Sequence, residues 1–198
     1  MTGFLAGFWL GLSLIVAIGA QNAFILKQGL RRQHVFVLSL VCAVSDALLI
    51  VAGVFGFAVL SAKLALVEPV ARYGGALFLF YYGLRSFRAA FTTSETLEAA
   101  SGSDVSLRTA LLTCLAFTWL NPHVYLDTIV LLGSVSTQYP DARVEFAAGA
   151  ATGSFAFFFS LGYGARLLAP IFKNPKAWNV LVLIIGCVMW TIAVSLLI

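Results

Sequence analysis

Two aspartates stand within stretches of sequence that are otherwise apolar, and they are the residues best suited to do chemistry. Asp46 follows Ser45 in the string CAVSDAL, and Asp127 ends the string TWLNPHVYLD. If these stretches cross a membrane, each carboxylate costs about 2.5–3.5 kcal/mol to insert at a helix centre. A salt bridge to a basic residue on another helix would be the structural explanation. We favour a functional one, because ionisable groups inside membranes usually mark the path of a substrate or a proton.

Polar side chains flank a proline in the stretch that carries Asp127. On a helix His123 and Asp127 would share a face, because they are four residues apart. Pro122 has no N–H and its ring clashes with the preceding turn, so the helix should break there, beside Asn121. A break frees carbonyl groups that suit a cation and N–H groups that suit a carboxylate. The alternative is an ordinary proline kink in which a neighbouring carbonyl satisfies His123.

A second interruption is expected near the N-terminus, where Gly19 precedes the amides Gln21 and Asn22. These amides stand in an apolar run, as Asn121 does beside Pro122. Amides in a membrane often only hydrogen-bond to a neighbouring helix, for about 1 kcal/mol or less. They can equally bind a solute at a broken helix, and the residues alone leave both interpretations open.

The composition shows what must position these residues. Of 198 residues, 61% are apolar and 10% are charged, and the mean hydropathy is +0.99. A soluble domain is about one quarter charged, so this chain has too few polar side chains to cover a surface in water. We predict an all-α integral membrane protein, a single transmembrane domain in contact with lipid. Its six apolar segments are Phe4–Leu26, Val35–Leu60, Val67–Leu84, Leu107–Val135, Phe146–Ala169 and Trp178–Ile198.

The order of the segments predicts two inverted repeats of three helices. They would span residues 1–91 and 107–198 and be joined by a polar connector at residues 92–106. The first helix of each repeat, helices 1 and 4 of the chain, would be interrupted at Gly19 and at Pro122. Inverted repeats with interrupted helices are common in transporters and bind the substrate at the interruptions.

Basic residues predict the orientation of the helices. Nine of the 12 lysines and arginines follow segments 1, 3 and 5, and three lie in the alternate loops. Cytoplasmic loops carry the excess of positive charge, which places the C-terminus outside. Whether the first segment spans fully stays open, because it contains Gly3, Gly7, Gly11 and Gly19. Small residues at this spacing let helices approach closely, either within the bundle or in a homodimer.

Several classes of site lack the residues that they would need. The three cysteines, Cys42, Cys114 and Cys187, stand singly in apolar runs, so we expect no disulfide, metal site or cofactor. The net charge of +4 comes from short loops between apolar segments, so we expect no nucleic-acid binding. No polar stretch is long enough for a soluble domain that hydrolyses nucleotides.

Three motifs resemble those of the lysine/arginine exporter (LysE/ArgO) family. They are GAQNAFILKQG at Gly19–Gly29, the pair Ser45-Asp46, and TWLNPHVYLD at Thr118–Asp127, and the match runs in order over nearly the whole chain. The histidine after Asn-Pro is more similar to the arginine-exporter branch. Where the family usually has proline, this chain has Ala20. The resemblance implies export of arginine or lysine from the bacterial cytoplasm across the inner membrane, by a secondary transporter rather than an enzyme.

A basic amino acid would need anionic groups for its cations and N–H donors for its carboxylate. Asp46 and Asp127 are the only acids deep in the apolar segments, so we expect one or both to face the cationic side chain. Moving one positive charge outward costs about 2.3 kcal/mol per 100 mV, whereas exchange for one proton is electrically neutral. A carboxyl group out of water can hold either partner, which predicts proton antiport through Asp46 or Asp127. The expected substrate site is completed by Gln21, Asn22, Asn121 and His123.

Three other functions stay open at this point. An exporter of neutral amino acids or other small solutes would not need two intramembrane acids, and a metal exporter would need more His, Cys or Met ligands. A membrane-embedded enzyme could use His123 and Asp127 as an acid–base pair, although no nucleophile or cofactor motif accompanies them. A non-catalytic assembly or sensing subunit would be expected to carry a soluble extension.

Overall fold

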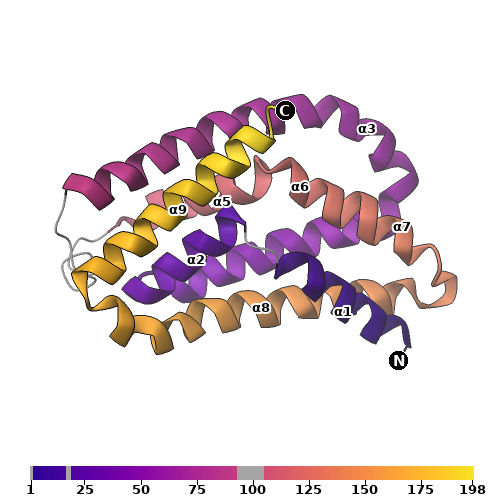
Figure 1. Ribbon diagram of the computed structural model, residues 1–198. Helices are drawn as coiled ribbons and strands as arrows, with labels where there is room; N and C mark the ends of the chain where they lie inside the picture. Colours follow the sequence, from indigo (N-terminus) through magenta and orange to yellow (C-terminus); the bar gives the residue numbers. More distant parts are fainter. Residues whose placement is uncertain (1, 17–18, 93–104) are drawn as a thin grey trace.

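The computed structural model describes residues 2–16, 19–92 and 105–198, and all the regular structure in these ranges is helical (Figure 1). Most of the predicted connector, residues 93–104, lies outside the described residues. The helices, in chain order, are α1 (Thr2–Ile15), α2 (Ala20–Arg31), α3 (Val35–Thr92), α5 (Leu107–Trp119), α6 (Pro122–Tyr125), the π-helix η1 (Leu126–Leu132), α7 (Gly133–Ser136), the 3₁₀ helix η2 (Pro140–Ala142), α8 (Arg143–Phe172) and α9 (Pro175–Ser195).

Helix α3 joins two of the predicted segments, Val35–Leu60 and Val67–Leu84, without a break. The expected boundary between them is therefore wrong. The physical reason is that residues 61–66 (SAKLAL) are mostly good helix formers, and Pro69 is held inside the helix. The ribbon of α3 nevertheless reverses its direction, so that its first part lies beside α8 and its second part beside α9 (Figure 1).

Three helical stretches of the described chain are long and apolar enough to cross a membrane: Val35–Ser61, Pro140–Phe172 and Pro175–Ser195. The pair α1 and α2, whose axes differ by 82°, makes a fourth if it is one broken span. The protein is thus a multi-pass helical membrane protein, as predicted. Two predicted segments are not among these stretches: Val67–Leu84 lies in the second part of α3, and Leu107–Val135 is divided among short helices.

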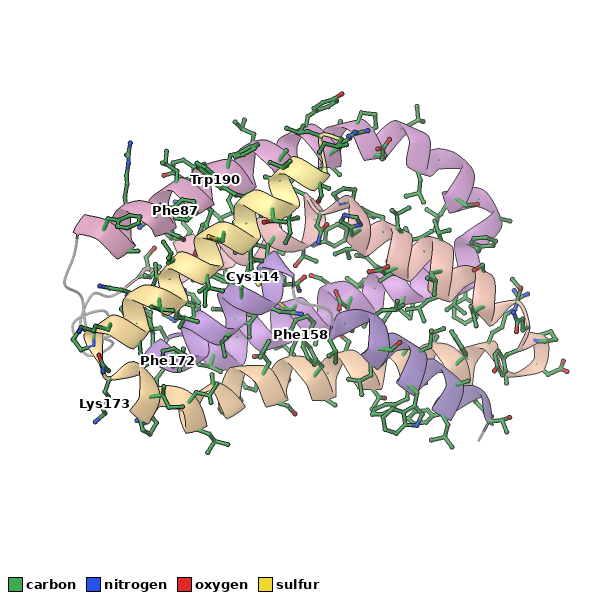
Figure 2. The ribbon with its side chains drawn as sticks, in the orientation of Figure 1. Phe87, Cys114, Phe158, Phe172, Lys173 and Trp190 are labelled. Carbon is green, nitrogen blue, oxygen red and sulfur yellow. The ribbon has the colours of Figure 1, made fainter. Side chains whose placement is uncertain are left out.

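The first and second parts of α3 are each fixed to a later helix. Ser39 in the first part donates a hydrogen bond to the carbonyl oxygen of Phe158 in α8, at 3.1 Å. In the second part, the carbonyl oxygen of Phe80 accepts one from the indole of Trp190 in α9, at 3.2 Å. Phe87 and Trp190 lie together between α3 and α9 (Figure 2), with ring centroids 4.9 Å apart. In Figure 1 the first part of α3 runs antiparallel to α8, and the second part runs antiparallel to α9.

Glycines allow a close contact between α1 and α8. A Cβ atom built on Gly7 would overlap the carbonyl oxygen of Phe146, and one built on Gly149 would overlap that of Phe4. The small-residue spacing noted in the sequence therefore serves packing within the chain. A homodimer would have to use another face, because these glycine faces already cover each other.

Aromatic rings fill the bundle where α2, α3 and α5 meet. The Phe117 ring of α5 lies 5.4 Å from that of Phe24, 4.9 Å from that of Phe78 and 5.0 Å from that of Tyr82, measured between centroids. Contacts of this kind each add about 0.5–1.5 kcal/mol beyond the burial of apolar area. They hold two helices against the second part of α3: α2, which follows the first interruption, and α5, which precedes the second.

Candidate functional site

A cavity of about 360 Å³ lies where the two interrupted segments meet. All six residues that the sequence predicted for a substrate site line it: Gln21, Asn22, Asp46, Asn121, His123 and Asp127. Gly19 also lines the cavity, whereas Pro122 is buried and does not. The remaining wall is mainly apolar and includes Ile50, Leu132 and Phe158. Residues from the N-terminal and C-terminal halves of the chain therefore share one site.

Asp46 lies in the first part of α3 and is 5% exposed. Its carboxylate accepts a hydrogen bond from the hydroxyl group of Ser154 in α8, at 3.1 Å. Ser154 is itself fully buried and does not line the cavity. This serine could not be predicted from the sequence, because a single serine in an apolar run is common and carries no recognisable spacing. The salt bridge considered for Asp46 is not found among the described residues.

Asp127 lies in the π-helix η1, which begins directly after the short helix α6. Short π-helical stretches are rare and often occur at functional sites. A close contact holds η1 against α3, since a Cβ atom built on Gly53 would overlap the carbonyl oxygen of Thr128. Gly53 lies two helical turns after Asp46. This contact places the two aspartates on different walls of the same cavity.

The interruption at Pro122 is closed by hydrogen bonds of its own. Asn121 is the N-cap of α6, and its side-chain oxygen accepts a bond from the backbone N–H of His123 at 3.1 Å. The hydroxyl group of Tyr125 donates to the carbonyl oxygen of Trp119, the last residue of α5, at 2.6 Å. Thus the break leaves the carbonyl group of Trp119 paired, and His123 remains exposed at the cavity.

The interruption near the N-terminus has a similar closure but a different cap. The side-chain amide of Asn22 donates to the carbonyl oxygen of Ile15, the last residue of α1, at 2.7 Å. Gly19 is the N-cap of α2 and offers no side-chain hydrogen bond to the helix. Gln21 is buried, at 7% exposed, and its Nε2 atom has no hydrogen-bond partner among the described residues.

The charges around the cavity are of one sign. Two carboxylates line it, together with one histidine and three side-chain amides, and no lysine or arginine stands among its lining residues. In the described part of the chain, no group of three or more His, Cys, Asp or Glu side chains could hold a metal ion. The cavity is therefore suited to a small organic cation that also carries hydrogen-bonding groups.

Comparisons with known proteins agree with this arrangement. The family model "LysE type translocator" matches residues 12–198. The chain is 43% identical to the arginine exporter protein ArgO of Pectobacterium carotovorum subsp. carotovorum (strain PC1) over 194 residues, which are 98% of this chain and 95% of the relative. It is 42% identical to ArgO of Serratia proteamaculans (strain 568), with the same coverage.

A third relative extends the comparison. The chain is 41% identical to ArgO of Escherichia coli (strain K12) over 191 residues, which are 96% of this chain and 90% of the relative. No solved structure matches. These findings confirm the resemblance drawn from the motifs, and they set the chain among translocators rather than enzymes. The protein belongs to the LysE type translocator family.

Proposed function

We propose that this protein exports arginine across the bacterial inner membrane, with lysine as a second basic substrate. Relatives that share 41–43% of its residues over nearly their whole length are named as arginine exporters. The observation that carries the proposal is the cavity itself. Asp46 and Asp127 come from different helices to the walls of one cavity that no lysine or arginine lines.

The two aspartates bind the cationic end of the substrate. A planar guanidinium group can bond a carboxylate through two parallel N–H donors, which favours arginine over a neutral side chain of equal size. Ser154 holds one carboxylate from behind, at 3.1 Å from the Asp46 oxygen. Asn121 and His123 contribute further hydrogen-bonding groups beside Asp127.

Export is driven by exchange of one proton for one substrate cation. Carrying a net positive charge outward against an inside-negative potential costs about 2.3 kcal/mol per 100 mV. Because a one-for-one exchange with a proton moves no net charge, the pH gradient alone can drive it. Asp46 or Asp127 binds the proton and the substrate in alternation, so that the proton moves inward and the substrate moves outward. The two can compete for one site because burial disfavours the charged form of a carboxylate unless a cation is bound to it.

The two halves of the chain act as inverted repeats in this proposal. Both interruptions lie at the cavity. The first part of α3 runs antiparallel to α8, and its second part runs antiparallel to α9. Nine basic residues lie in the loops assigned to the cytoplasm, which places the C-terminus outside. The substrate site then lies near the middle of the membrane, where such repeats meet.

Transport in liposomes tests the proposal. Purified protein is reconstituted, the vesicles are loaded with labelled arginine, and the outside is made acidic. We expect arginine efflux that depends on the pH gradient and is lost in Asp46→Asn or Asp127→Asn. Asp141→Asn is the matched control, because Asp141 is exposed in η2 and does not line the cavity.

Each part of the proposal has its own contradicting result. Efflux of neither arginine nor lysine from well-folded protein would overturn the substrate class. Efflux that ignores the pH gradient would overturn proton exchange and leave export standing. Efflux that persists with both cavity aspartates replaced would remove them from the site.

A further inference from the structure

Two exposed residues mark the opening of the cavity. Of the residues that line it, only His123 in α6 and Ser195 in α9 are exposed. Ser195 is the last residue of α9, and Ile192, about one turn before it, also lines the cavity and is half-buried. The last turn of α9 therefore forms one side of the opening, and the position of that turn sets how wide the opening is.

Arg72 of α3 holds this turn by a polar contact. Its Nε atom donates a hydrogen bond to the carbonyl oxygen of Leu196, the C-cap residue of α9, where the end of α9 lies beside α3 (Figure 1). The last carbonyl groups of a helix have no donor within the helix, and the helix dipole makes this end negative. A guanidinium group is a cation with several N–H donors, so it is well suited to both needs.

Neighbouring residues of α3 hold the other side of the opening. Glu68, one turn before Arg72, has its Oε1 atom 3.8 Å from the Nη1 atom of the guanidinium group. Gly75, about one turn after Arg72, lies against the end of α5, since a Cβ atom built there would overlap the carbonyl oxygen of Leu120. Asn121 follows Leu120 and lines the cavity. This stretch of α3 thus holds the end of α9 beside the second interruption.

The contact made by Arg72 can break without leaving a buried charge unpaired. The Arg72 side chain is 32% exposed and that of Glu68 is 50% exposed. Water can therefore replace the carbonyl group at a lower cost than in a fully buried ion pair. A contact of this kind can hold the last turn of α9 in one position and still release it in each transport cycle.

From this arrangement we infer that Arg72 is a positioning residue that holds the last turn of α9 at the outer opening of the cavity. The inference rests on the proposed export and on its orientation, which places the C-terminus outside. The substrate leaves between α6 and the last turn of α9 when the bond from Arg72 to the carbonyl group of Leu196 is broken. The bond forms again and narrows the opening before the cavity faces the cytoplasm.

A cysteine introduced by Ile192→Cys reports on the width of the opening. Cys187 is first replaced by serine so that it cannot react. Intact cells that produce the full chain are treated with a membrane-impermeant maleimide, and mass spectrometry measures the labelling. Loss of the hydrogen bond in Arg72→Gln should raise the labelling rate at position 192 about 3- to 10-fold. Arg72→Lys keeps a charged donor and should restore most of the low rate seen with arginine.

Two controls separate an open gate from a general loss of structure. Cys42 and Cys114 are native and fully buried, so their labelling should stay slow in every variant. Lys63→Gln removes the same charge from the same helix, and Lys63 is exposed and does not line the cavity. This variant should leave the labelling rate at position 192 unchanged.

Each outcome decides a separate point. An unchanged rate in Arg72→Gln, or a rise shared by Cys42 and Cys114, would overturn the positioning role, as would equal rates in Arg72→Gln and Arg72→Lys. Labelling of position 192 only in inverted vesicles would place the opening at the cytoplasm and remove the outer gate. If Arg72→Gln does not fold, Arg72→Met decides, because it removes the donor and keeps a long apolar stem. Labelling needs no transport, so the expected rise without arginine efflux would refute the proposed substrate and leave the gate standing.

Discussion

The hydroxyl group of Ser154 lies 3.1 Å from a carboxylate oxygen of Asp46 and donates a hydrogen bond to it. The bond joins α8 to the first part of α3 behind the cavity wall. Because both residues are buried, water cannot replace the donor readily. The bond therefore fixes the direction of the carboxylate that the proposed substrate meets.

Replacement of Ser154 by alanine should weaken substrate binding while the fold is kept. Loss of a hydrogen bond to a charged group is worth about 1.5–3 kcal/mol, so the KM for arginine should rise about 10-fold or more. The maximal rate should change less, since the carboxylate itself remains. Steady-state transport in liposomes measures both quantities. Ser160→Ala, at an exposed position of α8, should leave both unchanged; an equal loss in both variants would contradict the positioning role.

Replacement of Gly53 by alanine should separate η1 from α3. The added methyl group would overlap the carbonyl oxygen of Thr128 and crowd the Cα atom of Ile129, 2.8 Å away. Overpacking of this kind costs about 1–3 kcal/mol. We expect a lower midpoint in thermal unfolding in detergent and reduced arginine transport, because Asp127 would move away from Asp46.

The matched control for this substitution is Gly164→Ala in α8, where a Cβ atom would have no heavy atom within 4 Å. Alanine is favoured over glycine in a helix by about 0.5–1 kcal/mol, so Gly164→Ala should be neutral or stabilising. An unfolding midpoint that stays the same in Gly53→Ala would show that η1 and α3 are not in close contact.

Replacement of Tyr125 by phenylalanine should destabilise the interruption at Pro122. The hydroxyl group donates to the carbonyl oxygen of Trp119 at 2.6 Å, and a hydrogen bond of this kind contributes about 0.5–1.5 kcal/mol. Chemical or thermal unfolding in detergent measures the loss. Tyr139→Phe serves as the control, because the Tyr139 hydroxyl makes no hydrogen bond within the described chain. Equal stability of Tyr125→Phe and the wild type would exclude this role.

The three cysteines should differ in their reaction with a maleimide. Cys42 and Cys114 are fully buried, with sulfur atoms 3.1 Å apart, whereas Cys187 is exposed on α9. Because Cys187 lies within the span Pro175–Ser195, it faces detergent, and a small apolar maleimide is the suitable probe. In native protein Cys187 should react faster than Cys42 and Cys114, and denatured protein should take up three labels. Peptide mass spectrometry identifies the labelled positions. Native labelling of Cys42 at the same rate would contradict the packing of α3 against α5.

The sequence was sufficient to locate the residues of the cavity because charged and amide side chains are costly in apolar segments. Asp46, Asp127 and Gln21 could be chosen on that ground alone. It did not identify Ser154, because serine is tolerated in membrane helices and its partner is 108 residues away in the chain. Contacts of this kind depend on which helix faces meet, and no local pattern records that.

The limits of the helices were harder to predict than their existence. Hydropathy separates Val35–Leu60 from Val67–Leu84, but backbone hydrogen bonding continues through residues that favour a helix, and α3 results. The π-helix η1 was not predicted either. Its extra residue per turn leaves no trace in the apolar pattern of seven residues, LDTIVLL.

The hydrogen bonds that close the two interruptions have a consequence for biogenesis. Asn22 reaches back seven residues to Ile15, and Tyr125 reaches back six to Trp119, so each bond lies within one segment. A ribosome delivers these segments to the membrane one after another, and an unpaired carbonyl group in lipid is costly. Each interrupted segment pairs its own carbonyl group, so the first segment can stay in the bilayer until the second is inserted without leaving that carbonyl group unpaired. The two segments can therefore be inserted one after the other and packed against each other later.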